Sequence, residues 1–234
     1  MTKKKKFETI AIHTGNAPDE TTGSISPSIH LTSTYAQDGI GKNKGYDYSR
    51  GGNPTRSRLE ANIAALEGGY DAIAFASGMA ATTALFQRLK KGDHVIVSRN
   101  VYGGTYRLAT KILSNYGIDF DFVDTTNPNN IKRKIHKKTK WVFIETPTNP
   151  MLEITDIQLV AEICKEFSIK LAVDNTFMST YGQRPLEKGA DCVMHSTTKF
   201  ICGHSDVLGG ILVVKDESLA ESLHFIQKSG GAIP

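Results

Sequence analysis

The feature that most constrains the fold is an alternation of short apolar segments with longer helix-like segments, which begins after residue 53. The apolar segments are predicted to be strands that lie inside a sheet. The expected strands cover residues 71–75, 94–98, 119–123, 140–144, 170–173, 191–194 and 208–214. The expected helices cover residues 56–66, 78–89, 105–114, 129–136, 157–167 and 217–227. This order predicts an α/β fold, with a mostly parallel sheet and helices on both faces.

One strand is expected to run against the others. The segment between Met194 and Leu208 contains Gly203, His204, Ser205 and Asp206 and lacks helical periodicity. A parallel connection needs a crossover, usually a helix, and this segment is too irregular to supply one. Residues 208–214 are therefore predicted to return antiparallel.

Residues 1–52 differ from the rest of the chain. They are rich in Thr, Ser, Gly and Asn and show little periodicity, which predicts an extended N-terminal arm that reaches a neighbouring subunit. Residues 53–234 are expected to form a ligand-binding domain. The last five residues, Gly230-Gly231-Ala232-Ile233-Pro234, are typical of an interruption rather than of a domain end. We therefore expect this domain to be incomplete at its C-terminal side.

Composition excludes several classes of protein. Hydrophobic residues make up 39% of the 234 residues and charged residues 22%, as in ordinary globular proteins. No apolar run has the length of a membrane span, and no apolar stretch follows the lysine-rich start as it would in a secretory signal. The three cysteines lack Cys-x-x-Cys spacing, which favours buried thiols in a reducing compartment. These observations predict a cytoplasmic protein with no membrane partner.

Nucleic acid and metal are also not expected as ligands. The lysine-rich residues 132–140 are interpreted as the solvated face of a helix, because no interleaved aromatic residues accompany them. His204 and Asp206 could suggest a metal site. With Gly203 and Ser205 beside them, a turn held by hydrogen bonds is the preferred interpretation.

The two most informative polar residues, Lys199 and Asp174, each follow an expected strand. Open α/β sheets bind ligands at the edge where their strands end. A lysine amine there can attack an aldehyde, and a carboxylate in an apolar setting can keep a pyridine nitrogen protonated. Alone, such residues are more often a surface lysine and a helix cap. Together they predict a site for pyridoxal phosphate.

Groups suited to the phosphate of that cofactor also follow strand ends. Gly78 and Met79 lie where an expected strand turns into a helix, whose first N–H groups attract anions. This signal is weak alone, because many α/β turns share it. Ser196 and Thr198 add hydroxyl groups, and Tyr48-Ser49-Arg50 ends in a guanidinium that suits phosphate.

Three further residues are candidates for contact with the cofactor ring or the substrate. Tyr102 follows an expected strand, where its ring could stack on a flat ligand, although a tyrosine at the border of the core is the simpler interpretation. Arg107, one helical turn further on, could reach a substrate carboxylate. Asn149 lies between Pro147 and Pro150, which stiffen its loop, although an ordinary turn is the competing interpretation.

Taken together, these motifs resemble the Cys/Met-metabolism (trans-sulfuration) family of pyridoxal-phosphate enzymes. The matching segments occur in the family order: Tyr48-Ser49-Arg50, Asn53-Pro54-Thr55, Ala76-Ser77-Gly78-Met79-Ala80, Val101-Tyr102-Gly103-Gly104, Glu145-Thr146-Pro147-Thr148-Asn149-Pro150, Asp174-Asn175-Thr176-Phe177, Ser196-Thr197-Thr198-Lys199 and Gly203-His204-Ser205-Asp206. The resemblance implies the large domain of the type I PLP-dependent transferase fold, with the smaller C-terminal domain absent. It also implies a homo-oligomer, a dimer or a tetramer.

The resemblance implies a role for each matching residue. Lys199 would bind the cofactor aldehyde and shuttle protons, and Asp174 would pair with the pyridine nitrogen. Tyr102 would stack on the ring and act in catalysis, and Asn149 would contact cofactor or substrate. Arg107 would contact the substrate. The phosphate would be held by Gly78, Met79, Ser196 and Thr198 and, from a neighbouring subunit, by Tyr48 and Arg50.

Within the family, residues 174–179 and 183–186 look most like cystathionine γ-lyase, which converts L-cystathionine to cysteine, 2-oxobutanoate and ammonia. Cystathionine γ-synthase, which joins an O-acyl-homoserine to cysteine, is the alternative enzyme. A third hypothesis belongs to another class: an inactive fragment that only binds pyridoxal phosphate or a homologous subunit.

Overall fold

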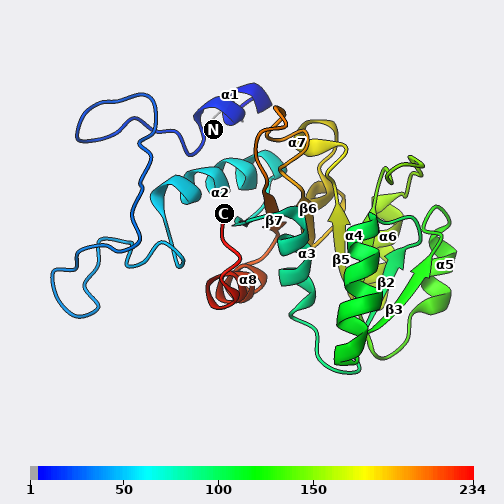
Figure 1. The fold of residues 1–234 in the computed structure, drawn as a ribbon. Helices are drawn as coiled ribbons and strands as arrows, with labels where there is room; N and C mark the ends of the chain where they lie inside the picture. The colour runs from blue at the N-terminus through cyan, green and yellow to red at the C-terminus, as the bar shows by residue number, and fades with distance from the viewer. Residues whose placement is uncertain (1–4) are drawn as a thin grey trace.

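The computed structural model describes residues 5–234, and at the centre of this part of the chain lies a seven-stranded sheet (Figure 1). The strands are β1 (Asp71–Phe75), β2 (His94–Ser98), β3 (Asp119–Val123), β4 (Thr139–Glu145), β5 (Lys170–Asp174), β6 (Cys192–His195) and β7 (Gly210–Val214). Their order across the sheet is β1-β7-β6-β5-β4-β2-β3. Each expected strand therefore forms close to its expected place.

The sheet is mostly parallel, as predicted. Strands β2 to β6 pair in parallel, whereas β7 runs antiparallel to both of its neighbours, β1 and β6. The irregular segment before β7 contains no helix, which leaves an antiparallel return as the available connection. The prediction of one antiparallel strand is confirmed.

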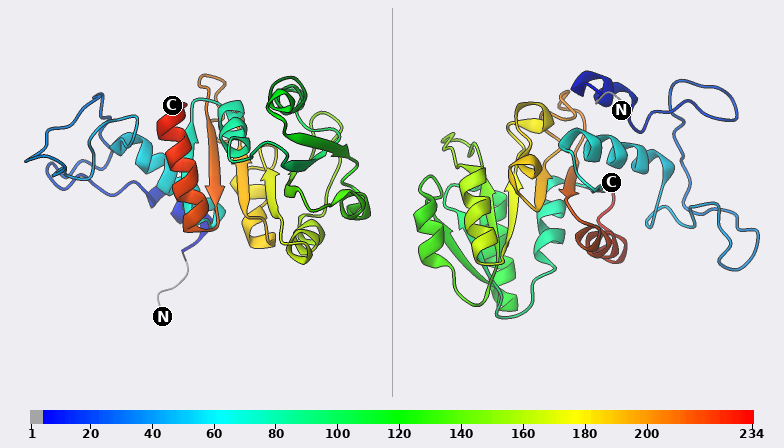
Figure 2. Two further views of the ribbon diagram at one scale, coloured as in Figure 1. Left: turned by 90° about the horizontal axis from the view of Figure 1, so that it is seen from below. Right: turned by 180° about the vertical axis from the view of Figure 1, so that it is seen from behind.

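Helices cover both faces of the sheet, as two further views show (Figure 2). The helices are α1 (Phe7–His13), α2 (Pro54–Glu67), α3 (Gly78–Phe86), α4 (Gly103–Arg107), α5 (Pro128–Lys134), α6 (Ile157–Glu166), α7 (Ser179–Gly182) and α8 (Glu217–Gly230). Short turns of π- or 3-10 helix follow at Leu108–Ile112, Leu113–Tyr116 and Pro185–Lys188. In residues 5–234, none of the helices has the length and apolar character that crossing a bilayer requires.

Two hydrophobic cores form, one on each face of the sheet. Successive side chains of a strand point to opposite faces. In β1, Ile73 and Phe75 therefore join the core under α3 and α8, whereas Ala72 and Ala74 join the core under α2 and α6. Most strands are continuously apolar because they are buried on both faces, whereas β3, at the edge of the sheet, alternates Asp with Phe.

The ends of α2 agree with their sequence signals. The Asn53 side chain accepts a hydrogen bond from the Thr55 N–H, and Gly68 ends the helix with φ 72°. Two other expectations need correction. Helix α3 ends at Phe86 rather than at residue 89, because the chain turns through Lys90 and Lys91 into β2. The expected helix 105–114 begins at residue 103 as α4 and changes to π- and 3-10-helical turns at residue 108.

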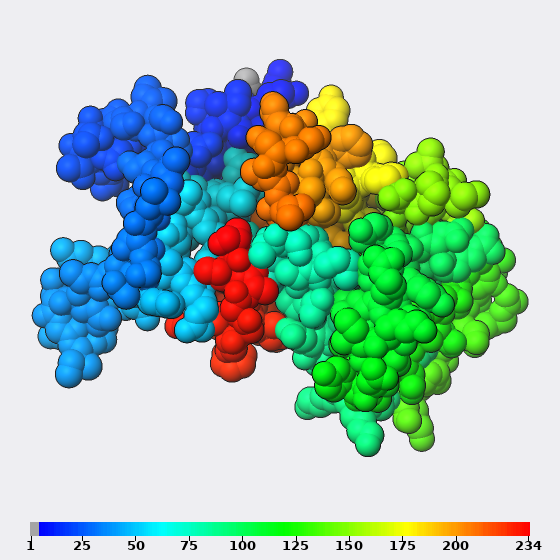
Figure 3. All heavy atoms as spheres, in the orientation of Figure 1, coloured from blue at the N-terminus to red at the C-terminus, as the bar shows by residue number. Residues whose placement is uncertain are grey.

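Part of the predicted arm is helical. Helix α1 packs on α2, where the Asn62 amide donates to the backbone oxygens of Ala11 and Thr14. Residues 15–52, which we call the arm loop, extend away from the sheet (Figure 3). One isolated bridge, Thr34 with Tyr48, crosses the arm loop. Residues 1–4 lie outside the described part of the chain.

Candidate active site

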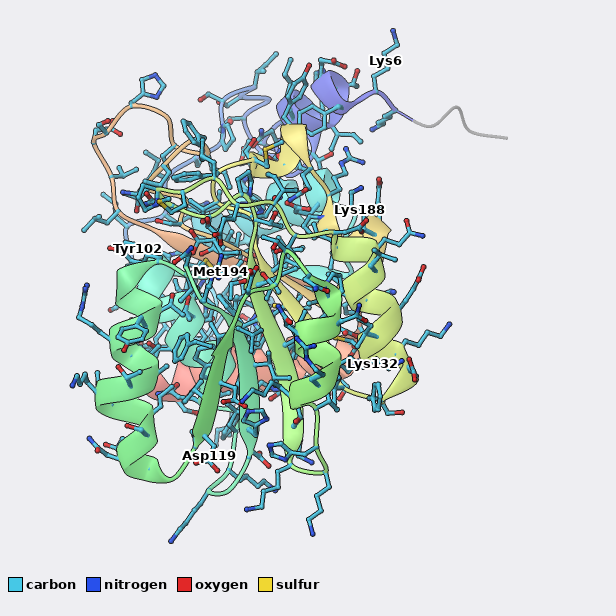
Figure 4. The ribbon with its side chains drawn as sticks, turned by 90° about the vertical axis from the view of Figure 1, so that its right-hand side faces the viewer. Lys6, Tyr102, Asp119, Lys132, Lys188 and Met194 are labelled. Carbon is cyan, nitrogen blue, oxygen red and sulfur yellow. The ribbon has the colours of Figure 1, made fainter. Side chains whose placement is uncertain are left out.

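The parallel strands end along one edge of the sheet, and a cavity of about 240 Å³ lies there. Figure 4 shows Tyr102 and Met194 near this edge, whereas Asp119, at the start of β3, lies at the opposite end. Fifteen residues line the cavity: Ser77, Gly78, Met79, Tyr102, Glu145, Pro147, Asn149, Asp174, Thr176, Phe177, Met194, Ser196, Thr198, Lys199 and Leu208. Eight of the predicted site residues are among them, contributed by segments after β1, β2, β4, β5 and β6.

Lys199 lies at the rim of this cavity on an exposed turn after β6. Its backbone N–H donates to the Ser196 carbonyl at 3.2 Å, which closes the turn. Among residues 5–234, no side chain pairs with its amine. The amine is therefore not neutralised by a carboxylate and remains available to a ligand.

Asp174 ends β5 and is 5% exposed. Burial raises the pKa of its carboxyl group, and hydrogen bonds from Thr176 oppose this rise, one of them from the Thr176 N–H at 3.0 Å. No ion pair to a Lys or Arg side chain forms at this carboxylate within the described residues. A cation in the cavity would relieve the buried charge, so the site suits a protonated ring nitrogen.

Glu145 is a site residue to which the sequence reasoning gave no role. It ends β4, directly opposite Asp174 in the register of β4 and β5. Its carboxylate accepts the Tyr102 N–H at 2.6 Å and the Asn149 N–H at 2.9 Å. Burial, and then the charge of Asp174, raises the pKa of Glu145 to about 7. A polar residue directly after apolar residues 141–144 is the signal that could have identified it, as it identified Asp174.

The first turn of α3 forms another wall of the cavity. The Ser77 hydroxyl caps the helix by accepting the Ala80 N–H, and the first N–H groups of a helix have no acceptor within it. A side chain at Gly78 would bring its Cβ to 2.8 Å from the Ser196 Cβ, so only glycine allows this approach. The Thr198 hydroxyl already exchanges hydrogen bonds with both backbone groups of Gly209.

Three predicted site residues do not line the cavity. Arg107 is exposed on α4, where its guanidinium lies beside Gly103. Arg50 donates to the Lys228 carbonyl at 2.6 Å and lies over the Tyr48 ring. The prediction for Tyr48 and Arg50 concerns the site of a neighbouring subunit, so it stays a prediction.

The donor set fits pyridoxal phosphate. A free amine, a buried carboxylate without a cationic side-chain partner and a helix N-terminus open onto one cavity, as the aldehyde, ring nitrogen and phosphate of this cofactor require. In residues 5–234, no group of three His, Cys, Asp or Glu side chains could hold a metal ion. The fold and the site thus define a PLP-binding α/β protein.

Comparison with known proteins agrees with this class. The family model of the Cys/Met metabolism PLP-dependent enzymes matches residues 8–234, and the chain belongs to this family. Pyridoxal 5'-phosphate is the cofactor of the family. A probable cystathionine gamma-synthase from Herpetosiphon aurantiacus is 47% identical over 97% of this chain and 72% of the relative. Cystathionine gamma-lyase from Bacillus subtilis is 49% identical over 97% of this chain and 60% of the relative.

A solved structure supports the fold in the same way. The structure of metB from Corynebacterium glutamicum superposes with a TM-score of 0.97 and 47% sequence identity, over 98% of this chain and 60% of that one. The chain spans about 60% of the length of several relatives, among them a gamma-lyase, a beta-lyase and a gamma-synthase.

Proposed function

We propose that the protein cleaves L-cystathionine by γ-elimination, which with water gives cysteine, 2-oxobutanoate and ammonia. The observation that carries the proposal is the single cavity in which Lys199 and Asp174 meet the first turn of α3. The family membership and the identity to a γ-lyase support the same reaction.

The protein's own residues have distinct tasks in this proposal. Lys199 binds the cofactor. When its amine is free, Lys199 removes the substrate α-proton and afterwards returns protons to other atoms of the substrate. Asp174 keeps the ring nitrogen protonated, and Tyr102 stacks on the ring. Gly78, Met79, Ser196 and Thr198 hold the phosphate, for which Thr198 must redirect its hydroxyl from Gly209. The bound cofactor supplies the electron sink that carbanion chemistry needs.

Outside this group, Asn149 contacts cofactor or substrate, and its position depends on Glu145. Arg107 contacts the substrate, as the family resemblance implies. Tyr48 and Arg50 complete the phosphate site of a second copy of the chain. Both arginines are exposed, and Arg50 would have to give up its hydrogen bond to the Lys228 carbonyl to make this contact.

The test is an assay of purified protein with PLP and L-cystathionine, in which 2-oxobutanoate and cysteine are measured. Release of both products in equal amounts, lost in Lys199→Ala, is the expected result. PLP binding without turnover would overturn the γ-lyase proposal. It would support the hypothesis that the chain is an inactive fragment that only binds the cofactor.

The second candidate is a γ-synthase, favoured by the identity to the Herpetosiphon aurantiacus relative. It would use the same residues but replace the γ-substituent of an O-acyl-homoserine with cysteine. Supplying the acyl-homoserine and cysteine to the same preparation distinguishes the two. Formation of cystathionine faster than its cleavage would select the γ-synthase.

A further inference from the structure

Behind the cavity lies a buried polar network to which the proposed reaction assigns no role. Its centre is a hydrogen-bonded pair at the end of α2, where Glu67 Oε1 lies 2.6 Å from His195 Nε2. Both side chains are fully buried. The Asn175 amide donates to the same Glu67 oxygen at 3.2 Å.

The network extends across three strand ends. The Gln183 amide nitrogen lies 2.9 Å from Asn175 Oδ1 and 3.2 Å from the Thr146 carbonyl, and donates to both. The whole network thus connects α2 with the ends of β4, β5 and β6.

Three of the network residues, Thr146, Asn175 and His195, are chain neighbours of cavity residues. Thr146 follows Glu145, Asn175 follows Asp174, and His195 precedes Ser196. Neighbouring side chains in an extended chain point to opposite sides, so the network supports from behind the residues that face the cavity. A shift of Glu67 would act on His195 and Asn175 through their side-chain contacts, and from them on the cavity residues through one peptide unit.

Stability alone does not account for this arrangement. A buried carboxylate loses hydration that its polar contacts often fail to offset, and apolar residues of equal volume are often as stabilising. Glu67 Oε2 and His195 Nδ1 are also buried without a hydrogen-bond partner in the described structure, which adds a further unfavourable contribution. A pair kept at such a cost fits a role in fixing geometry.

We propose that Glu67 and His195 are positioning residues of the cofactor site: the hydrogen-bonded contact between them holds the ends of β4, β5 and β6 in the one arrangement that binds pyridoxal phosphate. The inference rests on the proposed function only in that this cavity is where the cofactor binds.

The chain offers a matched control on the same helix. Glu60 is also a buried carboxylate of α2, but it accepts the Ala74 N–H within β1 and pairs with Arg56. Loss of Glu60 removes a comparable buried contact without touching the neighbour of a cavity residue.

The experiment compares Glu67→Leu with Glu60→Leu in purified protein freed of cofactor. PLP is titrated while the visible absorption and the circular dichroism of the bound cofactor are recorded, and thermal unfolding is measured without PLP. We expect Glu67→Leu to weaken PLP binding by about tenfold or more and to change the dichroism, as loss of residues that orient direct ligand contacts does. Glu60→Leu should lower the melting temperature similarly, with PLP affinity within about threefold of wild type.

A conservative variant separates loss of the hydrogen bonds to Glu67 from the effect of placing an apolar side chain there. Glu67→Gln keeps an acceptor oxygen for Asn175 and His195, so its PLP affinity should stay near that of wild type. If Glu67→Leu does not fold, His195→Gln is compared with the same control.

Two results would overturn the inference: wild-type PLP binding by the Glu67→Leu protein, or equal loss of affinity in both leucine variants at equal thermal destabilisation. If wild-type protein itself binds no PLP, the proposed function fails instead. The two failures are therefore distinguishable.

Discussion

The sheet and the arm loop belong to one chain but differ in what holds them in place. In the sheet, Ile96, Phe143 and Leu212 are fully buried. In the arm loop, Ile29 is 75% and Leu31 94% exposed. The sheet therefore carries its own stabilisation, whereas the arm loop contributes little apolar burial to the chain that contains it.

This difference bears on function. The cavity residues lie on strand ends and helix starts that the two cores hold in place, as a rigid catalytic site requires. The arm loop leaves Tyr48 and Arg50 on a segment that reaches outward. Its exposed apolar side chains support the proposal that it packs on a second copy of the chain.

The largest expected effect tests the comparison itself. Phe143→Ala removes a fully buried ring from β4 and should lower the free energy of unfolding by about 3–5 kcal/mol. Leu31→Ser should change it by less than about 0.5 kcal/mol in dilute protein. Urea denaturation of both variants provides the measurement, and similar losses of stability would contradict the distinction between the two regions.

The next prediction concerns the cavity edge. Asp174→Asn removes the charge that the proposal assigns to the ring nitrogen, and cystathionine cleavage should fall by about a hundredfold or more. Asp191→Asn is the control, because Asp191 precedes β6 at the other end of the sheet and pairs with Lys170. Comparable rates for the two variants, measured at saturating PLP, would remove Asp174 from the mechanism.

Glu145 should give the cofactor-free protein a specific pH dependence. Its pKa rises from 4.5 to about 7 in the folded chain, so the folded state keeps a proton that the unfolded state releases. Holding this proton contributes to the free energy of unfolding at low pH, and the contribution is lost as pH rises through about 7.

Relative to Glu145→Gln, the wild-type protein should therefore lose up to about 3 kcal/mol of unfolding free energy between pH 4.5 and 7.5. Urea denaturation at several pH values measures the difference. Parallel pH profiles for the two proteins would show that the buried carboxyl does not titrate as described.

The smallest expected effect returns to the arm loop. Arg50→Ala removes one hydrogen bond to the end of α8 and should lower the unfolding free energy of a single chain by about 1 kcal/mol at most. If Arg50 completes a neighbouring site, PLP affinity should weaken only at protein concentrations where copies associate. An equal change of affinity at all concentrations would place its effect within one chain.

The sequence was sufficient for the strands, because most of them are apolar runs bounded by turn residues. Eight of the predicted site residues line one cavity because each ends a strand or follows one within a few residues, and their roles stay predictions. It was not sufficient for α1, which is stabilised by its contact with Asn62 rather than by its own composition. The irregular turns after Arg107 were missed for a similar reason, since periodicity does not distinguish an α-helix from a π-helical turn.

Glu145 and Glu67 illustrate a second limit. The role of each depends on a partner far away in the chain: the register of Glu145 with Asp174, and the approach of α2 to His195. A single sequence contains no record of such pairings, and only the folded chain brings them together.

The most direct test of the account is to identify the lysine that binds the cofactor. The protein would be incubated with equimolar PLP, reduced with borohydride and digested, and its peptides analysed by mass spectrometry. The account predicts the pyridoxyl phosphate mass on Lys199, and its loss in Lys199→Ala. Labelling of another lysine, with Lys199 unmodified, would contradict it.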